Sequence, residues 1–84
     1  MLKSDRVVDP SEIIRRATSE MCVGNRVSCL IFRNGSVPSL GTVRGLAGGA
    51  NSPATLCVRV RFDFGGEIWC GVDEVVSWWP NSNW

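Results

Sequence analysis

The chain contains no histidine, and none of its four cysteines belongs to a C-x-x-C pair; they are Cys22, Cys29, Cys57 and Cys70. Structural zinc sites use cysteine and histidine at short spacings, so we expect no metal and no other cofactor. Without histidine the commonest general base is missing, and no nucleophile–base pair is evident. The residue types therefore favour a protein that is not an enzyme.

Long apolar runs and a strong net charge are also missing. No stretch of about 18 apolar residues predicts a transmembrane helix, and the opening MLKSDRVVDP lacks the apolar core of a signal peptide. We expect a cytoplasmic protein without a membrane partner, whose cysteines are reduced and act as small buried hydrophobes. Nine basic and eight acidic residues leave a net charge of +1, and a dedicated binder of duplex DNA is usually far more basic.

What is present suits one folded domain: 84 residues, 44% of them hydrophobic and 20% charged. Residues 1–9 are predicted to form a flexible tail, and residues 10–22 a helix. Asp9 suits the N-cap and Pro10 the first helical position. The helix has an apolar face at a period of 3.6, and this face needs cover from the rest of the chain or from a second subunit; it consists of Ile13, Ile14, Ala17 and Met21.

Alternation and turn residues predict five short strands, over residues 26–32, 41–46, 56–62, 67–70 and 75–79. The clearest runs from Leu56 to Phe62, where apolar residues at even positions alternate with Cys57, Arg59 and Arg61. Turn-rich segments at 33–39 and 47–53 separate the earlier strands, and residues 72–74 fit a single 3₁₀ turn. This order predicts a mainly β fold, a five-stranded SH3-like barrel over residues 24–80 with one N-terminal α-helix.

Short motifs along the chain carry a family resemblance: Gly24-Asn25-Arg26-Val27, Gly41-Thr42-Val43, Val60-Arg61-Phe62-Asp63, a Gly65-Gly66 turn, Trp69 and Asp73-Glu74-Val75. Over about residues 24–79 the chain resembles the small SH3-like barrels of bacteria, phages and mobile elements, including the accessory barrel of nitrile hydratase. The resemblance implies a fold, because such barrels serve many unrelated functions.

One member of that group, the plasmid-borne type II dihydrofolate reductase, carries a Val-Gln-Ile-Tyr signature on its catalytic strand. The corresponding stretch here reads Gly66-Glu67-Ile68-Trp69, in which Ile68 matches and Glu67 replaces the glutamine that contacts ligands. The family also uses a pore lysine, and the only lysine here is Lys3. The similarity implies an oligomer with a shared central site as one alternative for this chain.

Four residues of the predicted strands form a candidate binding surface, named here the arginine–tryptophan face: Arg44, Arg59, Arg61 and Trp69. Guanidinium groups beside an aromatic ring are what base stacking and phosphate contact require, so the face suits phosphate, single-stranded nucleic acid or an acidic peptide. The alternative is a solvated face on which the arginines pair with Asp63 and Glu67 across the hairpin.

Trp78 and Trp79 form a second candidate surface, an interface. Adjacent residues of a strand point to opposite faces, so one of the two should lie in the core and the other outside. Exposed tryptophan is typical of interface hot spots and of peptide-binding surfaces. We therefore expect a binding or assembly module that self-associates or binds a protein through tryptophan-bearing surfaces; the alternatives are a nucleic-acid-binding barrel and the reductase-like oligomer.

Overall fold

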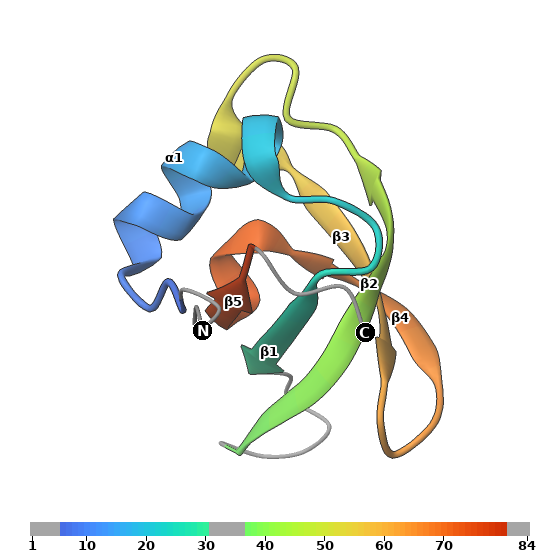
Figure 1. The fold of residues 1–84 in the computed structure, drawn as a ribbon. Coiled ribbons are helices and arrows are strands. Elements are labelled where there is room, and N and C mark those ends of the chain that lie inside the picture. The colour runs from blue at the N-terminus through green and yellow to red at the C-terminus, as the bar shows by residue number, and fades with distance from the viewer. Residues whose placement is uncertain (1–5, 31–36, 81–84) are drawn as a thin grey trace.

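The computed structural model describes residues 6–30 and 37–80 (Figure 1). Its elements, in chain order, are α1 (Pro10–Glu20), β1 (Arg26–Leu30), β2 (Pro38–Ala47), the 3₁₀ turn η2 (Pro53–Thr55), β3 (Cys57–Phe62), β4 (Glu67–Gly71), the 3₁₀ turn η3 (Val72–Glu74) and β5 (Val75–Trp79). The predicted fold class is confirmed at this level: a mainly β structure with five strands in one sheet and one helix.

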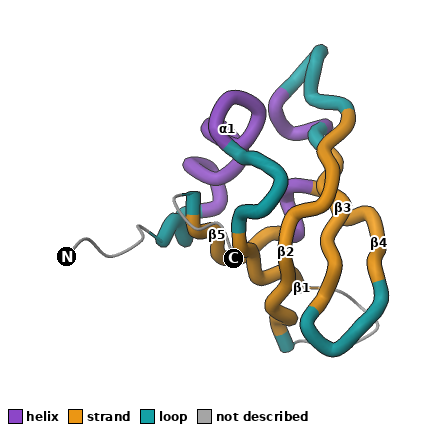
Figure 2. The backbone as a smooth tube through the Cα atoms, turned by 45° about the vertical axis from the view of Figure 1, so that its right-hand side comes forward, coloured by secondary structure: helices purple, strands orange, loops and turns teal. Residues whose placement is uncertain are grey.

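The strands form an antiparallel sheet in the order β4-β3-β2-β1-β5. Consecutive strands are neighbours except at the end of the chain, where η3 leads from β4 at one edge to β5 at the other. Among the described residues no ladder joins β4 to β5, so the sheet is not closed. The turn between β3 and β4 lies on the opposite side of the molecule from α1 (Figures 1 and 2).

The helix begins where the sequence predicted. Asp9 is its N-cap and accepts hydrogen bonds from Ser11 N at 3.0 Å and Ser11 Oγ at 2.8 Å, which lower the pKa of the Asp9 carboxyl group. The helix ends at Glu20 because Met21 adopts an extended backbone. Its buried side packs into the core of this chain through Ile13, Ala17 and Met21, so the apolar face is covered without a second subunit.

The core lies between α1 and the inward face of the sheet and consists mainly of β-branched residues. The even positions of β3 are buried as predicted, and side chains from every strand join them. The fully buried members include Ile13, Val27, Cys29, Val43, Val58, Val60, Val72 and Trp78. With the inward face filled, the outward face and the edges of the sheet are left for binding.

The predicted tail of residues 1–9 is only partly covered by the structure, since residues 1–5 lie outside the described part. The prediction is wrong at Val7, which is buried and pairs with Trp78 along the edge of β5. Val7 N donates to Trp78 O at 2.8 Å, and Trp78 N donates to Val7 O at 3.0 Å. Apolar burial and two backbone hydrogen bonds hold this segment against the sheet.

The second strand is longer than predicted. β2 begins at Pro38 instead of Gly41, and Ser39 is buried opposite Cys29 of β1. Proline is tolerated at the first position of a strand, so the turn-like composition before Gly41 did not prevent pairing. Residues 31–36, which complete the predicted first strand and most of the turn after it, lie outside the described residues.

Candidate functional site

The register of the sheet brings most of the arginine–tryptophan face together. Arg59 of β3 is directly opposite Trp69 of β4, and Arg61 is opposite Glu67. Cross-strand partners share one face of a sheet, so these side chains lie together on the outward face, as predicted. On the other side of β3, Arg61 faces Thr42 of β2.

Arg59 and Trp69 form the centre of this face. The guanidinium carbon of Arg59 lies 5.6 Å from the centre of the Trp69 ring, and Trp69 as a residue is 52% exposed. Such a stack contributes about 0.5–1 kcal/mol at an exposed site. Arg59 Nε also lies 3.0 Å from Glu67 Oε2, an ion pair without the direction of a hydrogen bond. Arg59 therefore holds Trp69 in place from β3.

Arg44 and Arg61 differ from Arg59, because neither has an acidic partner among residues 6–30 and 37–80, and both are exposed. Arg44 lies at the bulge where the register between β2 and β3 shifts. Its carbonyl oxygen accepts a hydrogen bond from Arg59 Nη2 at 3.4 Å, so it joins the face through its backbone. Two guanidinium groups are left available for an anionic ligand.

The predicted pairing of the hairpin acids with the arginines of β3 is correct for Glu67 and wrong for Asp63. Asp63 is bound by Arg26 of β1: Nη2 lies 2.6 Å from Oδ2 and Nη1 lies 2.9 Å from Oδ1. Arg26 Nη1 also donates to Thr42 Oγ1 at 2.9 Å. The bidentate contact lowers the pKa of the Asp63 carboxyl group.

Arg26 was not among the candidate residues predicted from the sequence. Its side chain is only 10% exposed and lies on the outward face at β1, where it binds Asp63. Its position could have been found from the sequence, because an arginine at the outward position of the first strand has to meet the strands beside it. The sequence does not show which residue Arg26 binds, because Asp63 lies 37 residues further along the chain.

The two tryptophans of β5 separate as the alternation predicts. Trp78 has an exposed fraction of 0%, so it offers no surface to a partner, and its predicted interface role does not fit this structure. It belongs to the core because α1 covers it: the guanidinium carbon of Arg16 lies 5.5 Å from its ring. Trp79 stays half-buried, with Arg6 6.0 Å from its ring centre, and remains the candidate interface residue.

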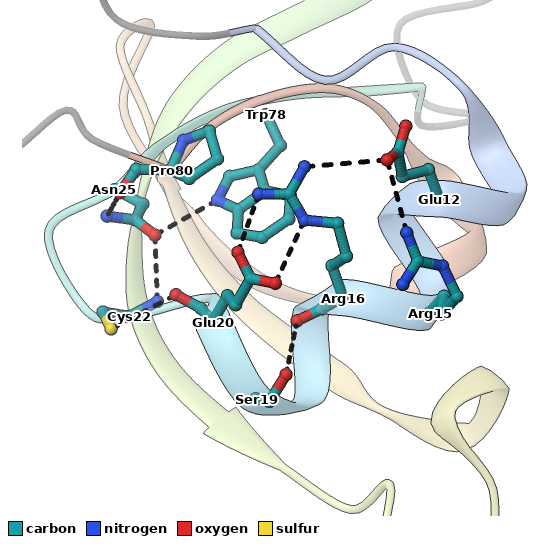
Figure 3. Close-up of polar contacts among 9 residues, drawn as sticks. All are labelled: Glu12, Arg15, Arg16, Ser19, Glu20, Cys22, Asn25, Trp78 and Pro80. Atoms are coloured by element: carbon teal, nitrogen blue, oxygen red, sulfur yellow. Dashed lines mark hydrogen bonds and ion pairs between the residues drawn. The ribbon is translucent and has the colours of Figure 1, made fainter.

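Asn25 connects the helix to the end of the chain (Figure 3). Its Oδ1 accepts hydrogen bonds from Cys22 N at 2.9 Å and from the Trp78 indole N–H at 3.1 Å, and its Nδ2 donates to Pro80 O at 3.2 Å. The nearby Arg16 is itself held by Glu20 at 2.7 Å. This cluster fixes α1 on β5.

The cysteines form no disulfide and no metal site in the described part of the chain. Cys29 and Cys70 are buried, as predicted, whereas Cys22 and Cys57 are exposed. The neighbouring Cys70 side chain and burial raise the pKa of the Cys29 thiol. Of the helices that the structure describes, none is long and apolar enough to cross a membrane.

Comparison of the chain with protein-family models, with curated proteins and with solved structures gave no match. The similarity to SH3-like barrels, and to type II dihydrofolate reductase among them, therefore stays a prediction from the sequence.

Proposed function

We propose that this protein is a non-enzymatic binding or assembly module with an SH3-like barrel fold, which associates with a second copy or a protein partner through tryptophan-bearing surfaces. The strand order supports the barrel. Although β1 and β4 are not neighbours in the sheet, the buried Cys29 side chain of β1 lies close enough to Cys70 of β4 to shift its pKa. The sheet must curve strongly for these side chains to meet inside it.

The observation that carries the functional proposal is the half-exposed Trp69, which stacks with Arg59 on the outward face of the sheet. Tryptophan and arginine are the residues most enriched in interface hot spots. A ring already held by a neighbouring guanidinium loses little rotamer freedom when a partner covers it. Both Glu67 and Trp69 contact Arg59, and this favours a contact surface over the reductase-like alternative, in which the two side chains would have to reach a ligand.

The test is the solution mass by light scattering, measured over a wide range of protein concentration. We expect a mass that rises to that of a symmetric oligomer. A mass equal to one chain at every concentration would remove self-association and leave a different protein as the required partner.

A second candidate function, binding of single-stranded nucleic acid, is favoured by Arg44 and Arg61. These two arginines are exposed and have no acidic partner among the described residues, and Arg61 lies two positions from Arg59, the cross-strand neighbour of Trp69. Together they supply the two elements of a single-strand site, cations for the phosphates and a ring for base stacking.

This candidate is tested by fluorescence anisotropy with a labelled oligothymidylate at increasing salt. Binding through the face should weaken steeply as salt rises, and Arg61→Gln should weaken it further. Arg15→Gln is the matched control, because the Arg15 side chain is 70% exposed on α1, away from the face. Equal losses in the two variants, or no binding at low salt, would exclude the nucleic-acid function.

A further inference from the structure

The two edge strands of the sheet, β5 and β4, differ in whether another segment covers their outer edge. The outer edge of β5 is covered at Trp78 by Val7, through two backbone hydrogen bonds. The outer edge of β4 has no such cover: of the described elements, only β3 pairs with it. In Figures 1 and 2, β4 lies at the side of the molecule farthest from α1.

The hydrogen-bond pattern identifies the backbone groups at this open edge. Phe62 N donates to Gly66 O at 3.0 Å, and hydrogen-bonded and non-bonded pairs alternate along an antiparallel ladder. The backbone groups of Ile68 therefore bond to β3. The amide and carbonyl groups of Glu67 and Trp69 point away from β3, in the plane of the sheet, toward its open edge. The same alternation holds at Gly71, whose amide points away from β3 and donates to Glu74 Oε1 at 2.8 Å.

Natural sheets protect such edges with lysine, proline, a bulge or a covering segment. β4, with the sequence Glu67-Ile68-Trp69-Cys70-Gly71, contains no lysine, arginine or proline, and its ladder with β3 has no bulge. Its one charged residue lies at its first position. The strand is thus open for pairing by both its backbone and its composition.

We propose that β4 pairs antiparallel with β4 of a second copy, across a two-fold axis at Trp69. This inference rests on the proposed self-association and names the surface that carries it. In this register the Trp69 amide of each copy donates to the Trp69 carbonyl oxygen of the other copy. Glu67 lies opposite Gly71 and its amide reaches the carbonyl of that glycine, while the Gly71 amide keeps its bond to Glu74 Oε1. The Asp73 and Glu74 carboxylates lie beside Gly71, so this end of the register is its least favourable part.

The side chains fit the same register. The two Trp69 rings are directly opposite each other on the outward face, where a pair of aromatic residues is favourable. On the inward face, Ile68 lies opposite Cys70, so the half-buried isoleucine gains an apolar neighbour. A second copy suits the edge because its own β4 brings the same half-exposed Trp69 to the axis, so that each of the two rings gains an aromatic partner.

The proposal is tested with the full chain, by amide hydrogen exchange read by NMR at low and high protein concentration. The Trp69 amide should exchange about tenfold or more slowly at high concentration, because it becomes hydrogen-bonded between copies. The Ile68 amide, bonded to β3 within one chain, should be protected at both concentrations and is the internal control.

A matched pair of variants supplies the second measurement. Trp69→Lys places like charges at the axis and should raise the dissociation constant by about tenfold or more. Phe64→Lys makes the same change at another exposed aromatic residue of the hairpin, 64% exposed in the turn beyond the strand, and should leave the mass unchanged.

The outcomes separate this inference from the proposed function. An oligomer whose Trp69 amide exchanges rapidly at every concentration, or that survives Trp69→Lys, would overturn the β4 pairing and keep self-association at another surface such as Trp79. A chain that is monomeric throughout would overturn both. Slow exchange together with loss of the oligomer in Trp69→Lys alone would establish the pairing.

Discussion

At the scale of single residues, buried polar groups carry much of the specificity of this fold. Asn25 and Arg26 follow each other in the chain and are both buried, yet they bind different segments. Asn25 bonds to Trp78 and Pro80, and Arg26 bonds to Asp63 in the β3–β4 turn. Because these groups have given up water, each partner has to be present for the residue to be tolerated.

Replacement of Asn25 by alanine should destabilise the protein by about 1–3 kcal/mol, because the buried indole N–H of Trp78 loses its acceptor. The free energy of unfolding from urea denaturation measures this. Ser19→Ala, at an exposed position of α1, is the control and should have little effect. Equal stabilities for the two variants would contradict the role assigned to Asn25.

The Arg26–Asp63 pair should make stability depend on pH. Its contact with Arg26 keeps the pKa of folded Asp63 below the ordinary value of 3.8. The stabilisation is therefore fully present above pH 3.8 and is lost as the pH falls through the lower pKa of Asp63 in the folded protein. In Asp63→Asn the free energy of unfolding should fall less steeply in this acid range, as urea denaturation at a series of pH values would show. Arg26→Gln should flatten the profile in the same way, and a profile as steep as that of the wild type would refute the coupling.

At the scale of elements, α1 is held by a narrow set of contacts. Ile13 is fully buried against the sheet, whereas its neighbour Ile14 is only half-buried. The periodicity predicted that both belong to the apolar side, but the position of the sheet decides which one is enclosed.

Ile13→Ala should therefore cost about 2–5 kcal/mol of unfolding free energy, as the loss of a buried isoleucine usually does. Ile14→Ala, the same change one residue along, should cost clearly less. Thermal and urea denaturation of the two variants make the comparison, and equal losses would mean that α1 docks in another orientation.

The pairing of β2 with β3 depends on a glycine. A Cβ atom at Gly41 would lie 2.6 Å from Val60 Cγ1 and 2.7 Å from Arg61 O, so Gly41→Ala should destabilise the protein by about 1–3 kcal/mol through overpacking. At Gly45, on the same strand, the nearest atom would be Arg59 Nε at 3.4 Å. Gly45→Ala should therefore be milder, and the order of the two midpoints in urea is the test.

At the scale of the whole molecule, the burial of two cysteines depends on how the complete sheet curves around the core. Cys29 and Cys70 come from strands that are not adjacent, yet both are buried and their side chains interact inside the molecule. Their contact depends on the curvature of the complete sheet and on no single element.

Alkylation of the native protein should accordingly modify Cys22 and Cys57 rapidly and leave the two buried thiols unreacted. Mass spectrometry before and after addition of urea counts the labels, with all four cysteines reacting in the unfolded chain. Rapid labelling of Cys29 in the native protein would show that the core opens easily.

Much of the fold could be predicted from local pattern. The bounds of β5 and η3 agree with prediction, the N-cap at Asp9 is correct, and the buried positions of β3 follow from its alternation. The arginine–tryptophan face could be predicted in part, since alternation sends Arg59, Arg61 and Trp69 outward. These features depend on residues close together in the chain, whose geometry the backbone period sets.

The sequence by itself determined the strands, the helix start and the separation of an apolar from a polar face, because each depends on neighbours a few residues apart. Only the tertiary structure decided that Trp78 is the buried tryptophan, that Asp63 binds Arg26 and that β3 alone, of the described strands, pairs with β4. Those outcomes depend on which distant segments meet, and that is set by sheet register and curvature together with the side on which α1 docks.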